Sequence, residues 1–265
     1  MSASARRILK RRLARYRRDI LLARQQLSAA DNGEALHQLR IGLRQLRSLL
    51  RGLGSLPGAA PLLRLSAQLR QLACAGNDWR DREVRLALLQ QAAGEADSRA
   101  FAAWRRREVM ALQAGRLDLQ QQAMVLDQLL PALQRACVPL LAHRNRRLRR
   151  TLRRALLQTR RRYRRARRDW QRRPGDALLA HRLRLLAKRL RYQIEAGGKL
   201  LGQRWRRRAQ RARDWQQQLG DERDRQLLLQ SIEREHIPLP VAARRWLEQG
   251  GSANLGGLLL AAGTS

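Results

Sequence analysis

Apolar residues recur at steps of three and four along nearly the whole chain, as they do between Leu36 and Leu50. This spacing places the apolar side chains on one face of an α-helix. Strands would instead give β-branched runs of alternating polarity, and the chain has only five valines and no such run. The pattern therefore predicts an all-α protein.

Short groups of Gly, Pro, Asn and Asp interrupt this pattern and mark the ends of the predicted helices. Clear interruptions are Gly76-Asn77, Gly94 and Pro174-Gly175-Asp176. We predict helices at residues 3–30, 34–53, 60–75, 79–93, 97–114, 121–141, 143–172, 176–200, 203–219, 222–235 and 240–249.

One segment of the chain repeats. Residues 36–47 align with residues 180–191, and both segments read His-x-x-Arg, followed by a base seven residues and another ten residues after the histidine. Self-similarity at a fixed distance indicates repeated structural units. A second motif supports this, because Arg80-Asp81 recurs as Arg223-Asp224 at a separation of 143 residues, against 144 for the histidine motifs.

The two motifs together indicate an internal duplication. Its halves meet near residue 142, so we predict one helical bundle over 1–142 and a second over 143–265. The basic first helix then corresponds to the Arg-rich segment 144–173. We expect the Arg-Asp pairs to cap helices near their N-termini or to form internal ion pairs.

The repeated motifs place cations in a row. On a helix, positions i, i+3, i+7 and i+10 lie within about 80° of one another and extend over roughly 15 Å. A leucine seam runs beside the row, so each helix buries apolar residues and directs cations along one edge. The first stripe comprises His37, Arg40, Arg44, Arg47 and Arg51, and the second comprises His181, Arg184, Lys188 and Arg191.

Net charge narrows the choice of partner. The chain has 57 Lys and Arg against 21 Asp and Glu, which gives a formal charge of +36. Such an excess repels itself in a compact fold and favours a polyanionic partner. A nucleic acid, an anionic membrane or inorganic polyphosphate would each fit.

A charge run is often only a solvated face, and the arginines of 144–173 are as well explained in that way as by a ligand. In particular, we expect Arg160, Arg161, Arg164 and Arg165 to be solvated. The stripes are better candidates for ligand contacts, because they occur twice in one register with few acids nearby. His37 and His181 either donate to an anion or bond within the protein, and the sequence leaves both alternatives open.

Recognisable catalytic or metal-binding motifs are missing from the sequence. Cys74 and Cys137 form no CxxC motif, and we expect both to be small buried residues. No phosphate-binding glycine loop, carboxylate cluster or nucleophile with a base is present. We therefore expect a binding protein without cofactor or metal, and no apolar stretch is long enough to predict a membrane span.

At the two stripes the sequence resembles the CHAD family, the conserved histidine α-helical domain. The second copy, AHRLRLLAKRLRYQIE, follows the family pattern closely, and the first, LHQLRIGLRQLRSLL, has Gln45 where a second arginine is usual. The resemblance implies two antiparallel helical bundles related by a pseudo-twofold axis, with a basic central groove or channel that binds inorganic polyphosphate. It adds Arg189 and Tyr192 to the second stripe. Further basic contacts are expected from Arg7, Lys10, Arg11, Arg147, Arg150 and Arg154.

The resemblance also bears on function. CHAD domains often accompany a CYTH triphosphatase domain, but Glu233-Arg234-Glu235 does not continue into the CYTH motif. We expect a polyphosphate-binding protein of the cytoplasm, associated with polyphosphate granules. The alternatives are a non-specific nucleic-acid-binding protein, since counterion release favours any strongly basic chain, and a phosphoanhydride hydrolase. Motifs for specific base readout are lacking.

Overall fold

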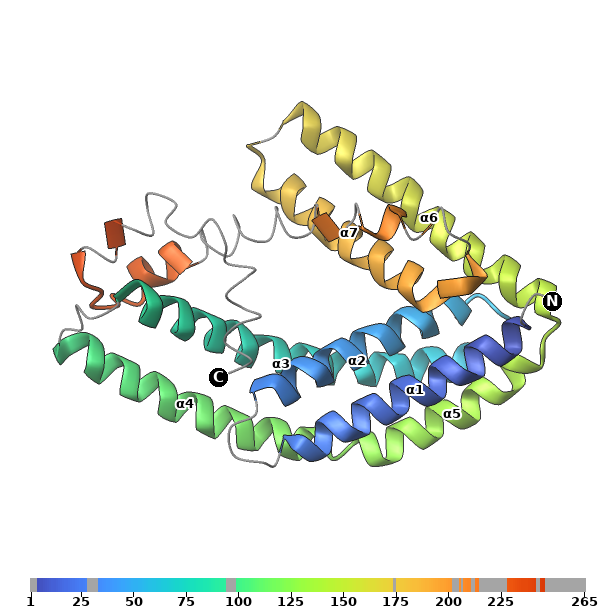
Figure 1. The fold of residues 1–265 in the computed structure, drawn as a ribbon, viewed down its shortest axis with the longest axis horizontal. Coiled ribbons are helices and arrows are strands. Elements are labelled where there is room, and N and C mark those ends of the chain that lie inside the picture. Colours follow the sequence, from blue (N-terminus) through green and yellow to red (C-terminus); the bar gives the residue numbers. More distant parts are fainter. Residues whose placement is uncertain are drawn as a thin grey trace. The chain divides into compact units, whose positions relative to one another are not determined.

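The computed structural model describes residues 4–27, 33–93, 99–173, 175–201, 205, 207–210, 213–214, 228–241 and 244–245 (Figure 1). All secondary structure in these residues is helical, so the predicted all-α class is confirmed. The elements are α1 (Ala5–Gln26), α2 (Gly33–Leu53), α3 (Ala60–Ala93), α4 (Arg99–Ala123), α5 (Leu126–Ala142), α6 (Asn145–Arg172), α7 (Ala177–Gly197) and the short 3₁₀ helix η1 (Gly198–Leu200).

The chain divides into two compact units. Unit 1 comprises Met1–Cys74 and Ala123–Leu219, and unit 2 comprises Ala75–Gln122 and Gly220–Ser265. The internal duplication, with halves at 1–142 and 143–265, stays a prediction.

Unit 1 is a set of packed helices around α2. Helix α1 packs on α2 and α5, α6 packs on α7, and α2 contacts both α6 and α7. The leucine seam of α2 is buried as its spacing predicts, and each fully buried leucine contributes roughly 1.5–3 kcal/mol. The seam comprises Leu36, Leu39, Leu43, Leu46 and Leu50.

A glycine allows α1 and α2 to approach closely. A Cβ atom placed on Gly42 would lie 2.7 Å from Cγ1 of Ile20, which is fully buried on α1. This distance is shorter than van der Waals contact, so a side chain at Gly42 would separate the two helices. The close packing holds α2, which carries the first stripe, against its neighbour.

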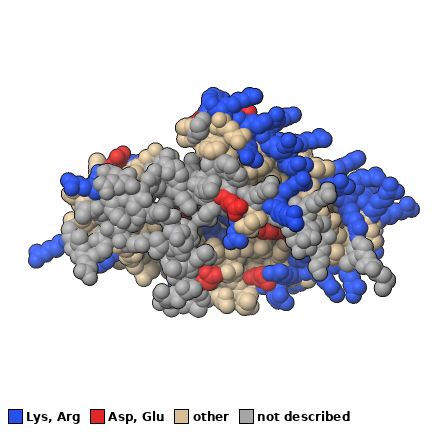
Figure 2. Space-filling view, turned by 45° about the horizontal axis from the view of Figure 1, so that its top comes forward, with Lys and Arg blue, Asp and Glu red and all other residues tan. Residues whose placement is uncertain are grey.

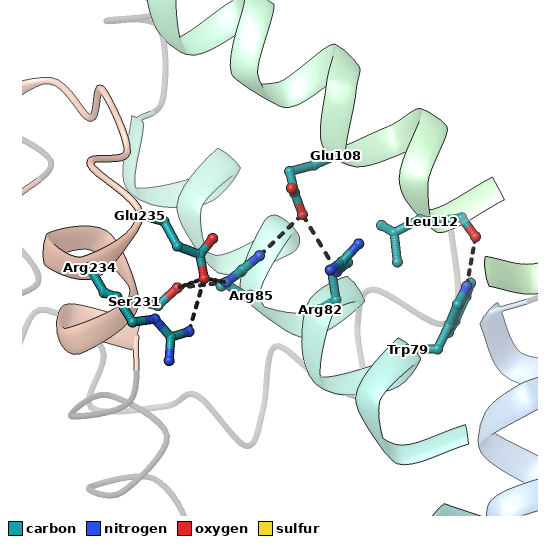
Figure 3. A network of polar contacts seen from close by, with 8 residues as sticks. All are labelled: Trp79, Arg82, Arg85, Glu108, Leu112, Ser231, Arg234 and Glu235. Atoms are coloured by element: carbon teal, nitrogen blue, oxygen red, sulfur yellow. Dashed lines mark hydrogen bonds and ion pairs between the residues drawn. The ribbon is translucent and has the colours of Figure 1, made fainter. Parts of the chain in front are cut away.

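Helices α3 and α4 correct two predicted boundaries. Helix α3 continues through the predicted break at Gly76-Asn77, and α4 continues past the predicted end at residue 114. A glycine inside a helix costs only about 1 kcal/mol relative to alanine. The indole of Trp79 contacts Gly115 in unit 2 and donates a 2.7 Å hydrogen bond to the carbonyl of Leu112 (Figure 3). Packing therefore outweighs the weak local signal of the glycine.

The continuous α3 also corrects the expectation that Arg80-Asp81 caps a helix, because the pair lies in the middle of α3 and not at its start. The alternative of an internal ion pair stays a prediction. The counterpart of this pair, Arg223-Asp224, lies outside the described residues. So do the predicted break at Gly94 and much of the predicted helices 203–219, 222–235 and 240–249. Within the last two, residues 228–234, 241 and 244–245 are helical.

Unit 2 contains a partly buried ion-pair network around Arg85 (Figure 3). The Arg85 guanidinium lies 3.1 Å from Glu108 of α4 and 2.6 Å from Glu235, and it donates to the hydroxyl of Ser231 at 2.6 Å. Arg234 lies 3.1 Å from the same Glu235 carboxylate. Acidic partners thus compensate the charge of Arg85, and this cation serves the internal structure of unit 2.

The two cysteines differ. Cys137 is buried on α5 as expected, and burial raises the pKa of its thiol to about 11. Cys74 is exposed, so the prediction of a buried residue was wrong there. Its position on α3 faces solvent because the apolar side of the helix is formed by Leu69 and Leu72.

Candidate anion-binding site

The two stripes lie on α2 and α7, which pack against each other within unit 1. Helix α7 begins at an N-cap formed by Asp176, whose carboxylate accepts 3.0 Å hydrogen bonds from the backbone N–H groups of Leu178 and Leu179. The cap satisfies two donors of the first turn and fixes the start of the helix. The register of the second stripe along α7 follows from this start.

Tyr192 joins the two stripes. Its ring is almost fully buried, with 4% of its surface exposed. Its hydroxyl oxygen accepts a hydrogen bond from Arg44 of the first stripe and another from Arg191 of the second, each 3.1 Å long. Both guanidinium groups also lie near the ring, with their carbon atoms 5.3 and 4.6 Å from its centroid. The structure thus brings together two motifs that are far apart in the chain.

An acidic side chain lies beside the second stripe. The carboxylate of Glu195 is 3.1 Å from Nε of Arg191, one helical turn away. The backbone carbonyl of Glu195 accepts a hydrogen bond from Arg12 of α1. The sequence predicts stripes with few acids nearby, but Glu195 partly compensates the charge of Arg191.

A cavity of about 1080 Å³ lies where α6 faces the C-terminal part of α2 and the C-terminal half of α7. Eight arginines line it, and none of the lining side chains among the described residues is acidic. Figure 2 shows Lys and Arg side chains gathered over α6, at the upper right of that view. We call this space the arginine cavity, and its arginines are Arg51, Arg144, Arg146, Arg147, Arg150, Arg154, Arg161 and Arg189.

The helical register of α6 explains the arrangement. Leu148, Leu152 and Leu156 are buried and hold α6 against the rest of unit 1. The arginines at positions 147, 150, 154 and 161 repeat at the spacing of one helix face, roughly opposite the buried leucines, and line the cavity. The sequence of α6 therefore buries one side of the helix and directs a row of cations from the other side into a shared space.

Repulsion between cations is evident in the arginine cavity. Loss of solvent around the guanidinium lowers the pKa of Arg189, and the charges of Arg51 and Arg162 lower it further. Loss of solvent also lowers the pKa of Arg51, with further lowering by Arg47 and Arg70. Arginine still remains charged at neutral pH. A bound anion would relieve this repulsion.

A buried amide lies in the wall of the same cavity. Gln193 of α7 is 7% exposed, and neither its side-chain oxygen nor its nitrogen has a hydrogen-bond partner in the protein. A buried polar group without a partner costs about 1–3 kcal/mol. Sequence reasoning missed Gln193, since an isolated glutamine carries no charge signal. A ligand in the cavity could bond to both of its polar atoms.

The remaining predicted site residues are distributed over three helices. His37, Arg40, His181, Arg184 and Lys188 are half-buried on α2 and α7, outside the lining of the arginine cavity. Both histidines take part in interactions within the protein. Arg47 is half-buried on α2, and loss of solvent lowers its pKa. Arg7, Lys10 and Arg11 are exposed on α1.

Arg160 is half-buried, against the expectation of a solvated face, whereas Arg161 is exposed as expected. Arg161 lines the arginine cavity. The guanidinium carbon of Arg160 lies 5.9 Å from the centroid of the Trp205 ring. Arg144 and Arg146 also line the cavity, although only their Arg-rich segment was singled out in the sequence. Arg164 and Arg165 are exposed as expected.

Among the residues that the structure describes, no group of three or more His, Cys, Asp or Glu could hold a metal ion. No helix in this part of the chain combines the length and apolar character needed to span a bilayer.

Comparison with known proteins identifies a family model and a solved structure. The model of the CHAD domain matches residues 6–233. The crystal structure of the CHAD domain from the plant Ricinus communis superposes with a TM-score of 0.67 at 22% sequence identity, covering 100% of this chain and 93% of that chain. At this identity the superposition concerns the fold alone. No curated protein sequence matches the chain.

Proposed function

Because the chain belongs to the CHAD domain family, we propose that it binds inorganic polyphosphate, with the arginine cavity as the main contact region. The two stripes extend the basic surface from this cavity along α2 and α7. The family has polyphosphate-related roles, and a linear chain of phosphates would suit a row of cations on several helices.

The observation that carries the proposal is the pairing of eight arginines with a buried, unpartnered amide in one cavity. Arginine donates two hydrogen bonds in a plane that matches a phosphate group, and such charge-assisted bonds are strong. Gln193 could donate to one phosphate oxygen and so offset the cost of its own burial. Generic basicity would not require a buried amide in the wall.

Competition binding tests this proposal. Labelled polyphosphate, duplex DNA and single-stranded RNA are compared at equal phosphate concentration and matched physiological salt. We expect polyphosphate to displace both nucleic acids, because the cavity offers guanidinium groups to phosphates and few aromatic surfaces to bases. Equal affinity per phosphate for the three polymers would overturn the proposal.

A non-specific nucleic-acid-binding function is the second candidate, and the net charge of +36 favours it. Counterion release would give such a protein affinity for DNA or RNA that falls steeply with salt. The two functions differ in their dependence on the cavity. Substitution of Gln193 would weaken polyphosphate binding under the first and leave DNA binding unchanged under the second.

We further propose that the protein binds polyphosphate without cleaving it. Hydrolysis of a phosphoanhydride needs a positioned water and usually carboxylate-bound Mg²⁺. Arginines that bind the ground state and the transition state equally do not accelerate the chemical step. A time course of released orthophosphate with Mg²⁺ or Mn²⁺ tests this. Turnover that survives repurification and disappears in an Arg40→Gln/Arg184→Gln variant would assign the chain to the hydrolases.

A polyphosphate-binding protein of the cytoplasm would collect on polyphosphate granules. We propose this location, and a fluorescent fusion imaged in cells with and without polyphosphate tests it. Foci that persist in cells lacking polyphosphate would contradict granule association.

A further inference from the structure

A second cavity in unit 1, of about 820 Å³, lies between α1 and α5. The two helices are antiparallel, since Arg6 donates to the carbonyl of Ala142 and Arg17 donates to the amide oxygen of Gln134. Lining positions on α1 extend from Arg6 to Gln25, which corresponds to about 28 Å of helix. We call this space the α1/α5 groove. It is elongated along both helices.

The two walls of the groove differ in chemistry. The α5 wall carries no charge among its lining residues; Leu130, Leu133, Cys137 and Leu141 are buried and form the floor of the groove, and Val138 is exposed above them. The α1 wall alternates leucines with cations. Those cations are Arg6, Lys10, Arg17 and Arg18.

The groove leaves apolar side chains in contact with solvent at both edges. Val138 on the α5 edge is 64% exposed and Leu22 on the α1 edge is 53% exposed. Exposed apolar residues that line an elongated cavity rimmed by cations favour an interaction site. The hydrogen-bond acceptors of Arg6 and Arg17 across the groove are a carbonyl and an amide, so these bonds leave both positive charges uncompensated.

We propose that the α1/α5 groove binds an amphipathic helix of a partner protein, with acidic residues along one flank of that helix. The apolar face of the helix would cover Val138, Leu21 and Leu22 above the buried floor of the groove, and its acidic flank would lie against the cations of α1. Binding an amphipathic helix in an apolar groove is a recurrent mode of recognition.

The distribution of charge selects this occupant. The cations from Arg6 to Arg18 extend over about 18 Å of helix, whereas an amphiphile with one anionic head would need cations only at one end. A second copy of the chain, with its charge of +36, would place cations against cations. A helix can lie inside a concave groove and contact both of its walls, whereas a flat bilayer would contact only the edges of the groove.

The probe is a fluorescein-labelled 20-residue peptide, about 30 Å long as a helix, with leucines on one face and glutamates on the adjacent flank. A peptide of the same composition in shuffled order lacks the apolar face and controls for charge. Fluorescence anisotropy at physiological salt measures both dissociation constants. We expect the ordered peptide to bind at least about tenfold more tightly, because only it can fill the apolar wall.

Two glutamate substitutions form a matched pair. Val138→Glu introduces a charge into the groove, and Leu178→Glu makes the same change at a leucine of α7 that is 81% exposed. We expect Val138→Glu to weaken binding of the ordered peptide about tenfold or more and Leu178→Glu to have little effect. Leu22→Glu provides a second groove variant if circular dichroism shows that Val138→Glu does not fold. A photoreactive group on the peptide should crosslink to α1 and α5.

Several results would overturn the proposal. Equal binding of the ordered and shuffled peptides would show attraction by charge alone. Phosphatidylglycerol vesicles or oleate that bind in a Val138-dependent manner, without peptide binding, would assign the groove to a membrane or an amphiphile. Self-association that Val138→Glu abolishes would assign it to a second copy.

Discussion

The side chains of Arg44 and Tyr192, 148 residues apart in the chain, are joined by a 3.1 Å hydrogen bond from the guanidinium to the phenol oxygen. Arg191 donates to the same oxygen. One buried ring thus connects the first stripe on α2 to the second on α7. Tyr192 orients the arginines of both stripes, so its hydroxyl should affect the stability and the geometry of the basic surface together.

The first prediction concerns this contact. Tyr192→Phe removes the shared acceptor and should lower the free energy of unfolding by about 1–3 kcal/mol, because two half-buried guanidinium groups lose a partner. In a double-mutant cycle with Arg44→Gln, urea denaturation should give a coupling energy of about 0.5 kcal/mol or more. Tyr163→Phe on α6 is the control and should be close to neutral. Additive effects of the two substitutions would show that the hydrogen bond contributes nothing.

The second prediction compares two groups of four arginines. Replacing Arg51, Arg147, Arg150 and Arg189 by Gln removes half of the arginines from the arginine cavity. This variant should bind polyphosphate at least about 100-fold more weakly, since a charge-assisted hydrogen bond contributes about 1.5–3 kcal/mol. Isothermal titration calorimetry measures the affinity.

The matched control for this comparison lies nearer the C-terminus of α6, outside the lining of the arginine cavity. The exposed residues Arg164, Arg165, Arg168 and Arg172 are replaced by Gln, which removes the same charge. This variant should lose far less affinity. If the two variants bind alike, net charge and not the arginine cavity determines binding.

The third prediction separates stability from binding at Gln193. Gln193→Leu replaces an unpartnered buried amide by an apolar side chain and should raise the free energy of unfolding by about 1 kcal/mol. The same change should weaken polyphosphate binding, because a ligand would lose a hydrogen-bond donor. Gln193→Glu should also weaken binding and should stabilise the free protein, since its carboxylate lies among cations. Gln158→Leu, an exposed residue of the same cavity, is the control.

These outcomes are read from urea denaturation and calorimetry of the same preparations. A Gln193→Leu variant that binds polyphosphate as well as the unsubstituted protein would show that the amide has no role in the site. Loss of both stability and binding would indicate that Gln193 is bonded within the protein.

The fourth prediction concerns pH and the Arg85 network of unit 2. Burial alone would raise the pKa of Glu235, but hydrogen bonds from Arg85 and Arg234 outweigh it, so the pKa lies below its ordinary value of 4.5. A lowered pKa means that the folded state binds protons less readily than the unfolded state. The stabilisation is therefore complete above about pH 4.5 and is lost as pH falls through the pKa of the folded state.

Urea denaturation between pH 3 and pH 6 measures this dependence. Glu235→Gln should flatten the fall in stability at acid pH. Asp118→Asn, at an exposed residue of α4, should leave the fall unchanged. An identical profile for Glu235→Gln and the unsubstituted protein would contradict the assignment of this step to the network.

Much of the fold could be predicted from residue spacing. The leucine seam of α2 and the cap at Asp176 are local signals, because helix faces and first turns depend on residues within a few positions of one another. The same reasoning failed at Gly76-Asn77 and near residue 114. The helical propensity of glycine is too little below that of alanine to decide by itself where a helix ends. Packing of Trp79 against Gly115, which is distant in the chain, outweighs this difference.

The sequence by itself determined the helical class, the two cationic stripes and the excess of positive charge. Each of these follows from residue identity and from the fixed period of the helix. Only the tertiary structure decided which cations share a space. Arg161 and Gln193 lie together with Arg51 in one cavity because α6 and α7 pack around α2. Contacts between residues so far apart in the chain depend on how the helices pack, and helical period alone does not specify that packing.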